Sequence, residues 1–309
     1  MATPKAAFVW MNGQCVPWAE ATVHVSCDAV CFGSSVFEGL RGYLDPETGQ
    51  VYVFRLAEHM DRLWDSMKVL RMTLPWSKAD IGAACTGLVA KNGFREDVQI
   101  RPTAYFGEGP LGAYQPDKIF TGAFILSSPK ATTLKDANGI ACCVSSWRRI
   151  ADSVLPPRVK AGANYLQSRL VYVQAGIDGY RNAILLNDRG KVSEGPGACF
   201  MIVKNGTVIT PPVTADILES ITRSTIAQFC REELGVPFLE REVDRTEVYL
   251  ADEALFCGSA WEICPVASVD RYPIGDGRVG PITERLRTLY QAVVRGQVAK
   301  YKHWLTPVY

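Results

Sequence analysis

A lysine surrounded by small side chains is the position in this sequence best suited to chemistry. Lys160 lies in the segment VKAGA at 159–163. Lysine usually extends into water, whereas small neighbours let a cofactor come close to the amino group, and a lysine so placed can form a Schiff base. Taken alone, the segment is better explained by a solvated loop lysine.

Three short segments could complete a cofactor site with such a lysine. The turn SEGPG at 193–197 carries a carboxylate that could face the protonated nitrogen of a pyridine ring. The segment SITR at 220–223 starts a predicted helix, where backbone N–H groups and the helix dipole favour a phosphate. The segment CGSAW at 257–261 could present N–H groups and a hydroxyl to an anion. Each segment also has a plain explanation, as a turn glutamate, an N-cap and a loop.

The elements that must position these residues alternate between strands and helices. Apolar residues recur at helical spacing over about 57–72, which predicts a helix with Arg62 beside its apolar stripe. A second helix is expected from a cap at Ser220 to about Leu234, with Gly235 as its stop. Other predicted elements are hairpins at 8–18, 183–195 and 199–210, strands at 99–106, 117–127, 140–147 and 253–258, and a last helix near 281–300.

A polar segment with little periodicity, from 127 to 139, predicts a connection between two domains. We expect a smaller N-terminal domain at 1–127, a linker at 128–135 and a larger C-terminal domain at 136–309 that makes most cofactor contacts.

Composition limits the function classes. The chain has 309 residues, 48% hydrophobic and 21% charged, with a formal net charge of +1, which argues against disorder and against a globally basic surface for nucleic acid. No apolar run is long enough to span a membrane and no secretion signal is evident. Isolated histidines and ten cysteines without a CxxC motif argue against a metal site. The cysteines are typical of buried thiols in a reducing cytoplasm.

Considered together, these segments resemble the fold-type IV pyridoxal-phosphate (PLP) enzymes, and among them the branched-chain amino acid aminotransferases. The resemblance extends from about residue 8 to 305. Its segments occur in family order: GSSVFEGLRGY (33–43), EHMDRLWDSMK (58–68), IRPTAYFG (100–107), VKAGANYLQSRL (159–170), the turn at 193–195, SITRSTI (220–226), YLADEALFCGSAWEICPV (249–266) and GPIT (280–283).

The resemblance implies cofactor roles for particular residues. Lys160 would bind PLP covalently and then move the proton. Glu194 would pair with the pyridine nitrogen, and Tyr165 would hydrogen-bond the phenolic oxygen of the ring. The phosphate ligands implied are Arg62, the backbone of Ile221 and Thr222, and Ser259.

The resemblance also implies the substrate contacts. The turn at Ser259 and Ala260 would offer N–H groups to the substrate carboxylate, and Arg101 would help bind an acidic co-substrate such as glutamate. The residues implied in or beside the substrate pocket, partly across a dimer interface, are Phe37, Glu38 and Arg41.

Four positions depart from the family pattern. Phe32 and Gln99 stand where tyrosines are common, Trp261 replaces a small residue, and Cys199 stands where asparagine often occurs. Losing the two hydroxyls removes polar contacts worth about 1 kcal/mol each. Trp261 would narrow one side of the pocket or add a stacking surface. The departures leave the cofactor residues intact and bear on the substrate.

The resemblance therefore implies an α+β chain with the two-domain fold-type IV PLP-dependent transaminase fold and PLP in the cleft between the domains. The expected enzyme transfers an amino group from leucine, isoleucine or valine to 2-oxoglutarate by a ping-pong mechanism, as a homodimer or an assembly of dimers. Alternatives are a fold-type IV transaminase for D-amino acids, aromatic amino acids or (R)-amines, an aminodeoxychorismate lyase, and a binding protein without catalysis.

Overall fold

The computed structural model describes residues 6–110, 115, 118–134 and 138–309. Two compact units make up the chain. Unit 1 comprises Met1–Ala131, Val159–Ala163 and Ala292–Tyr309, and unit 2 comprises Thr132–Arg158 and Asn164–Gln291. The predicted linker overlaps the first boundary, and its residue 135 lies outside the described residues. The continuous C-terminal domain predicted from the sequence differs from this division, because the lysine segment and the chain end group with unit 1.

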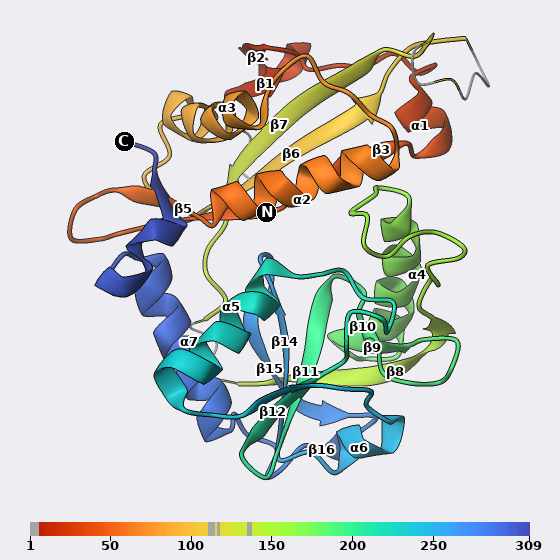
Figure 1. The fold of residues 1–309 in the computed structure, drawn as a ribbon, viewed down its shortest axis with the longest axis vertical. Helices are drawn as coiled ribbons and strands as arrows, with labels where there is room; N and C mark the ends of the chain where they lie inside the picture. The colour runs from red at the N-terminus through yellow and green to blue at the C-terminus, as the bar shows by residue number, and fades with distance from the viewer. Residues whose placement is uncertain (1–5, 111–114, 116–117, 135–137) are drawn as a thin grey trace. The chain divides into compact units, whose positions relative to one another are not determined.

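Unit 1 is built on an eight-stranded antiparallel sheet in the order β17-β5-β4-β6-β7-β1-β2, with β3 paired to β6. The long pair β6–β7 runs through its middle (Figure 1). The strands are β1 (Phe8–Met11), β2 (Gln14–Pro17), β3 (Ser35–Phe37), β4 (Leu40–Leu44), β5 (Val51–Phe54), β6 (Val98–Phe106), β7 (Thr121–Pro129) and β17 (Leu305–Pro307).

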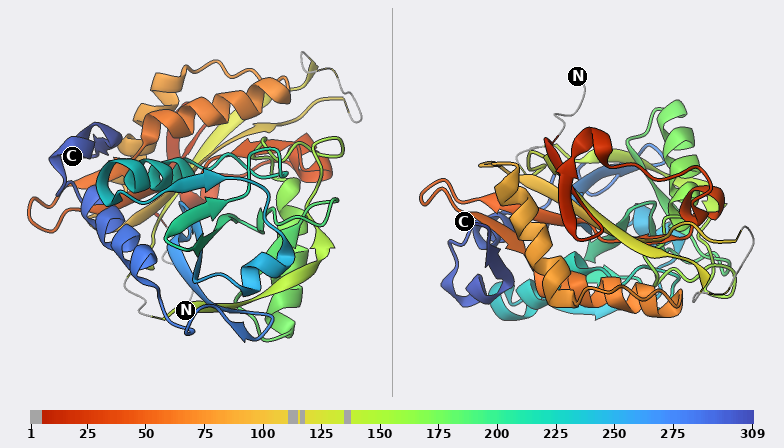
Figure 2. Two further views of the ribbon diagram at one scale, coloured as in Figure 1. Left: turned by 60° about the horizontal axis from the view of Figure 1, so that its bottom comes forward. Right: turned by 90° about the horizontal axis from the view of Figure 1, so that it is seen from above.

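Two helices of unit 1 share one hydrophobic core with this sheet. They are α2 (Leu56–Val69) and α3 (Lys78–Lys91), which pack on each other and appear as neighbouring orange helices in Figures 1 and 2. Their apolar faces are buried against the strands, which fixes the position of α2 relative to β3. Shorter helices are η1 (Trp18–Glu20), α1 (Asp28–Phe32) and η4 (Ala299–Trp304).

Unit 2 is built on a nine-stranded mixed sheet in the order β13-β12-β11-β14-β15-β8-β9, with β10 paired to β11 and β16 to β15. The pairs β12–β13, β15–β8 and β8–β9 are parallel. The strands are β8 (Ile140–Arg148), β9 (Asn182–Leu186), β10 (Glu194–Gly195), β11 (Ala198–Lys204), β12 (Thr207–Thr210), β13 (Phe238–Glu240), β14 (Glu253–Gly258), β15 (Glu262–Val269) and β16 (Tyr272–Pro273).

The helices of unit 2 pack along this sheet, with α4 against β8 and β9 and α5 against β14 (Figure 1). They are α4 (Asn164–Ile177), α5 (Ile221–Phe229), which continues as a π-helical segment η3 (Cys230–Leu234), α6 (Arg245–Tyr249) and α7 (Pro281–Val294). Within the described ranges, no helix is long and apolar enough to cross a lipid bilayer.

Most predicted elements are confirmed with small shifts at their ends. The hairpin tip is confirmed, with Asn205 at φ 50° and Gly206 at φ 73°. The predicted strand at 117–127 begins later, at Thr121, and its residue 117 lies outside the described residues. The last helix ends at Val294 and not near 300, because the chain turns to φ 79° at Gly296, a conformation that stops an α-helix.

Candidate active site

Lys160 is held through its backbone by a strand and a helix of unit 1. Its carbonyl oxygen accepts a hydrogen bond from the Phe37 N–H of β3 at 3.0 Å, and its own N–H donates to Ser66 Oγ of α2 at 3.2 Å. A Cβ on Gly162 would lie 2.6 Å from Ser35 Oγ, so a larger residue there would force the Ser35 side chain to move. The small residues around the lysine therefore serve close packing on β3 as well as access to the amino group.

The ring of Phe37 contacts two cations of unit 1. Lys160 Nζ lies 5.2 Å from the ring centroid, and the Arg101 guanidinium carbon lies 3.7 Å from it. Both distances are in the range of cation–π attraction. Phe37 is buried, Arg101 is exposed on β6, and Gln99 is half-buried two residues earlier. The structure thus brings three of the predicted residues, from three separate segments of the chain, into one group.

Arg62 forms a bidentate ion pair with Glu38. Arg62 Nε lies 2.7 Å from Glu38 Oε1, and Nη2 lies 2.8 Å from Oε2. His59 Nδ1 is 2.7 Å from the same Oε2. The side chain of Glu38 is 0% exposed and that of Arg62 is 14% exposed. The carboxylate that the resemblance placed in or beside the substrate pocket is therefore buried behind Arg62 and His59.

The charges in this group are set by burial and by pairing. Burial raises the pKa of Glu38, but the Arg62 charge and the hydrogen bonds from His59 and Arg62 outweigh burial and hold that pKa well below its usual value of 4.5. Burial also lowers the pKa of His59 below its usual 6.5, against the opposite pull of Glu38. At neutral pH the carboxylate is therefore ionised and the imidazole neutral, so its Nδ1–H donates to Glu38.

Arg41 and Phe32, both predicted to bind substrate, have different surroundings in unit 1. Arg41 is buried on β4, where its Nε donates to Val98 O at 3.2 Å and its Nη2 donates to Lys130 O at 2.7 Å and to Ala131 O at 3.3 Å. Phe32 ends α1 and is 49% exposed. Arg41 thus supports the backbone where the chain leaves unit 1, and the substrate contacts of both residues stay predictions.

Glu194 in unit 2 is buried beside an arginine that the sequence analysis missed. Arg149 Nη2 lies 2.8 Å from Glu194 Oε1. The Leu218 N–H donates to both carboxylate oxygens at 3.3 Å, and Cys199 Sγ lies 3.8 Å from Oε2. Arg149 is itself held by the Asp216 carbonyl oxygen at 3.2 Å. Sequence alone gave no signal for Arg149, because it follows a strand 45 positions before its partner.

The start of α5 has the geometry expected of a phosphate site. Ser220 caps the helix, its side chain accepting from the Arg223 N–H at 3.3 Å. Ile221 and Thr222 are the first helical residues and are both buried. N–H groups in the first helical turn have no acceptor within the helix, and they favour an anion.

The turn after β14 is anchored from two sides within unit 2. The indole of Trp261 stacks on Tyr172 of α4, with ring centroids 6.5 Å apart, and its Nε1 donates to Tyr172 Oη at 3.2 Å. Burial raises the pKa of Tyr172 to about 12. The carboxylate of the next residue, Glu262, accepts from Thr133 N–H at 2.6 Å. Trp261 therefore stacks on a residue of the protein itself, and its expected effect on the substrate pocket stays a prediction.

Tyr165 and the residues of the turn complete the predicted set. Tyr165 is half-buried in the first turn of α4, and Ser259 and Ala260 lie between β14 and β15. The Trp261 N–H donates to Gly258 O at 3.1 Å, which closes this turn. A closed turn after a strand can present backbone N–H groups to an anion.

The donor sets of the two units match the parts of PLP. Unit 1 supplies an amino group from Lys160 and a guanidinium from Arg62, which suit the aldehyde and the phosphate. Unit 2 supplies a buried carboxylate from Glu194, which suits a protonated ring nitrogen, and the start of α5, which suits a phosphate. The residues present therefore fit this cofactor.

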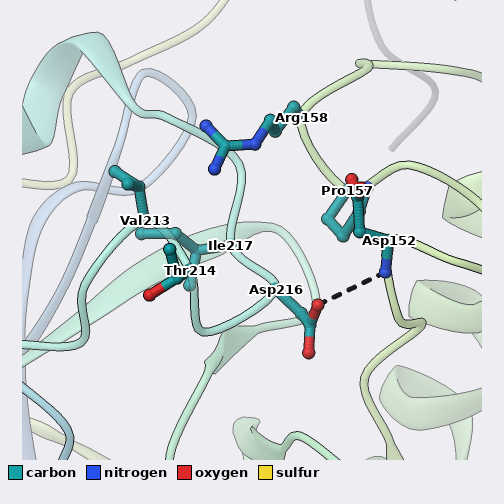
Figure 3. A pocket seen from close by; sticks show the side chains of 7 residues that line it. All are labelled: Asp152, Pro157, Arg158, Val213, Thr214, Asp216 and Ile217. Carbon is teal, nitrogen blue, oxygen red and sulfur yellow. Dashed lines mark hydrogen bonds between the residues drawn. The ribbon is translucent and has the colours of Figure 1, made fainter.

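A pocket of about 200 Å³ lies on unit 2 (Figure 3). Asp216, at a positive φ of 61°, accepts from the Asp152 N–H at 3.3 Å across this pocket. Burial raises the pKa of Asp216. The Asp216 carbonyl oxygen accepts a hydrogen bond from Arg149 Nε. A residue that lines the pocket therefore also holds the arginine of the Arg149–Glu194 pair. The lining residues are Asp152, Pro157, Arg158, Val213, Thr214, Asp216 and Ile217.

Comparison with known proteins assigns the family. The family model for amino-transferase class IV matches residues 35–269. The chain is 40% identical to the branched-chain-amino-acid aminotransferase of Salmonella typhimurium, over all of this chain and 99% of that protein. This chain belongs to the class IV aminotransferase family.

Solved structures give the same result. The branched-chain amino acid aminotransferase of Thermobaculum terrenum in its PLP form matches with a TM-score of 0.93 and 44% identity over 99% of each chain. That of Escherichia coli matches with a TM-score of 0.94 and 38% identity, over 99% of this chain and 100% of that chain. The predicted α+β class IV fold, the aminotransferase class and the cofactor PLP are confirmed.

Proposed function

We propose that this chain transfers the amino group of L-leucine, L-isoleucine or L-valine to 2-oxoglutarate by a ping-pong mechanism, with Lys160 as the catalytic residue. The observation that carries the proposal is the environment of Lys160, whose backbone is bonded to β3 and α2 and whose amino group faces the Phe37 ring. Full-length similarity to branched-chain aminotransferases supports the substrate class.

Each side chain has a defined task in this proposal. PLP, when bound, supplies the electron sink that stabilises negative charge at Cα of the amino acid. Lys160 would hold the cofactor through Nζ, and the free Nζ would accept the proton from Cα of the amino acid and donate it to the cofactor carbon next to the nitrogen. Glu194 keeps the ring nitrogen protonated, and Tyr165 donates to the phenolic oxygen.

The remaining residues bind and orient. Arg62, the N–H groups of Ile221 and Thr222, and the Ser259 hydroxyl hold the phosphate. The turn at Ser259 and Ala260 binds the substrate carboxylate, and Arg101 binds the second carboxylate of glutamate or 2-oxoglutarate. The side-chain pocket is lined by Phe32, Phe37, Arg41, Gln99 and Trp261.

A substrate panel tests this proposal. Purified holoenzyme is supplied with 2-oxoglutarate and one amino donor at a time, and glutamate formation is measured. We expect turnover with L-leucine, L-isoleucine and L-valine. Turnover restricted to D-alanine, L-phenylalanine or (R)-1-phenylethylamine would leave the cofactor chemistry in place and overturn the substrate class. Pyruvate release from aminodeoxychorismate without a keto acid would identify the lyase.

We also propose a homodimer that uses the outer face of α4. Leu166, Leu170, Val173 and Ile177 recur at spacings of four, three and four, and are 65%, 44%, 51% and 80% exposed. Such an apolar stripe is typical of a helix that packs on a second helix. Ile177→Glu should shift sedimentation equilibrium towards the monomer, whereas Ala83→Glu on the exposed side of α3 should not. An unchanged mass for Ile177→Glu would contradict the use of this face.

The cytoplasm is the proposed location, because all ten cysteines are free thiols, as expected in a reducing compartment. Cell fractionation with activity assays tests it, and activity confined to an extracellular or periplasmic fraction would overturn it.

A further inference from the structure

We propose that Glu38 and His59 are positioning residues that orient Arg62 towards the phosphate of PLP. The inference rests on the proposed role of Arg62. It concerns two residues for which neither the family resemblance nor the chemistry of the lysine requires this role. Glu38, His59, Arg62 and Lys160 all belong to unit 1.

The first step is the geometry of the guanidinium. Glu38 engages Arg62 through Nε and Nη2, at 2.7 and 2.8 Å. This side-on pairing fixes both the plane and the direction of the guanidinium, because two parallel hydrogen bonds remove its freedom to rotate. The pairing thereby holds the whole planar guanidinium in one orientation, as a bidentate contact with a phosphate requires.

Second, the two residues that hold Arg62, Glu38 and His59, are more deeply buried than Arg62 itself. Glu38 is 0% exposed and His59 is 2% exposed, whereas Arg62 is 14% exposed. The carboxylate is thus inaccessible to a solvated ligand, and the arginine is the member of the group that reaches outwards. His59 Nδ1 at 2.7 Å holds the Oε2 atom that Arg62 Nη2 also uses, so the imidazole fixes the carboxylate in turn.

The third step links this group to Lys160. Glu38 directly follows β3, and its N–H donates to Pro102 O of β6 at 2.9 Å. The residue before it, Phe37, donates to the Lys160 carbonyl. On α2, Ser66 accepts from the Lys160 N–H one turn after Arg62. Two neighbouring elements, β3 and α2, therefore position both the proposed phosphate ligand and the lysine, which sets the spacing between the two groups (Figure 1).

Binding to the cofactor-free full-length chain tests the inference. PLP and its unphosphorylated analogue pyridoxal are titrated separately, with protein fluorescence and cofactor absorbance as readouts, and the ratio of their dissociation constants gives the phosphate preference. Glu38→Gln keeps the size of the side chain but replaces one acceptor oxygen with an amide that repels Arg62. We expect it to reduce the phosphate preference about tenfold to a hundredfold, with pyridoxal binding little changed. Asp65→Asn, the same change on the exposed side of α2, should leave the preference unaltered.

Two further variants separate this inference from the proposed function. Arg62→Ala should remove most of the preference, and an unchanged preference there would overturn the phosphate role of Arg62 and the inference with it. A lost preference in Arg62→Ala together with a full preference in folded Glu38→Gln would overturn the inference alone. If circular dichroism shows Glu38→Gln to be unfolded, His59→Gln decides the question in the same titration, with a reduced preference supporting the inference and a full one overturning it.

Discussion

Each unit contains a buried arginine–glutamate pair. The member proposed to bind the cofactor is the arginine in unit 1 and the glutamate in unit 2. In unit 1 the carboxylate of Glu38 is 0% exposed, and the more exposed Arg62 is proposed to bind the cofactor. In unit 2 the roles reverse, because Arg149 supports the carboxylate of Glu194, which is proposed to bind the cofactor. A charge on a cofactor-binding residue needs an opposite charge behind it when water is excluded, whichever sign the ligand requires.

The pairs also differ in their additional partners. His59 adds a short hydrogen bond of 2.7 Å to Glu38. Glu194 instead receives a backbone N–H from Leu218 at 3.3 Å and a weak contact from Cys199 at 3.8 Å. Glu38 also receives a long backbone contact from the Gly39 N–H at 3.4 Å, so two side chains give most of its support, whereas Glu194 combines one arginine with the Leu218 N–H. The four predictions below test this contrast, from the largest expected effect to the smallest.

Glu194→Gln removes the negative charge of the residue in the unit 2 pair that is proposed to bind the cofactor. The amide cannot hold the ring nitrogen protonated, so we expect kcat to fall about a hundredfold or more, consistent with the loss of a charged hydrogen bond. Stopped-flow and steady-state rates at saturating L-leucine measure it. Glu219→Gln, an exposed carboxylate 25 residues later, is the control. A kcat equal to that of the wild type would remove Glu194 from the mechanism.

Arg149→Gln removes the positive charge that is paired with Glu194. It leaves Glu194 buried without its cation, which typically costs about 3–5 kcal/mol. Because the Leu218 N–H remains, we expect the lower end of this range, seen as a fall in the free energy of unfolding by urea and in thermal midpoint. Arg158→Gln, which breaks an exposed pair with Glu219, should change stability by less than about 1 kcal/mol. Equal losses in the two variants would contradict the buried role of Arg149.

Because His59 is buried beside the Arg62–Glu38 pair of unit 1, we expect the free energy of unfolding to depend on pH. His59 is held neutral when folded, so its pKa is below the usual 6.5, and the unfolded chain binds the extra proton as pH falls below that value. The free energy of unfolding should therefore decline below pH 6.5 by at most about 1.4 kcal/mol per pH unit from this residue. His59→Gln should have a flatter profile between pH 7 and 5.5. Identical slopes in the wild type and the variant would show that His59 does not titrate on unfolding.

Cys199→Asn alters the weakest contact of the unit 2 pair. Since Arg149 and Leu218 still bind Glu194, we expect kcat to change by less than about threefold. The same steady-state assay measures it, with Cys264→Ser as a half-buried cysteine control. A loss as large as that of Glu194→Gln would mean that the thiol, and not the arginine, is the main support of the carboxylate.

Sequence reasoning identified the parts of the site that follow local rules. The cap at Ser220 and the hairpin tip at Asn205 each depend on neighbouring residues and form where the spacing predicts. Glu194, expected on a turn, lies instead in the short strand β10, and the turn follows at Pro196 and Gly197. Helix α4, which carries Tyr165 in its first turn, was not predicted, and the role of Tyr165 comes only from the family resemblance. Local pattern offered a chemical role for the segments at Glu194 and Ser220 beside a plain structural explanation, and only the family resemblance chose between the two.

The supporting residues could not be found in this way, because their partners are distant along the chain. His59 is isolated in sequence and meets Glu38 only when α2 packs beside β3. Arg149 meets Glu194 only through the fold of unit 2. Helix α3 carries Ala and Gly at many positions, so small residues dilute its apolar stripe and no prediction was made for it. Its burial against the strands of unit 1 supplies the stability that the pattern lacks.

The most direct test of the central claim is a half-reaction with Lys160→Ala beside the wild type. L-leucine is added to each PLP-loaded protein without a keto acid, and the cofactor spectrum and 4-methyl-2-oxopentanoate formation are followed. We expect the wild type to release about one keto acid per cofactor with L-leucine and none with D-leucine, as required when the first half of a ping-pong reaction is isolated. Lys160→Ala should release keto acid at least about ten-thousand-fold more slowly, because it lacks the base that moves the proton. Release at the wild-type rate by Lys160→Ala, or no release of keto acid by the wild type, would contradict the account.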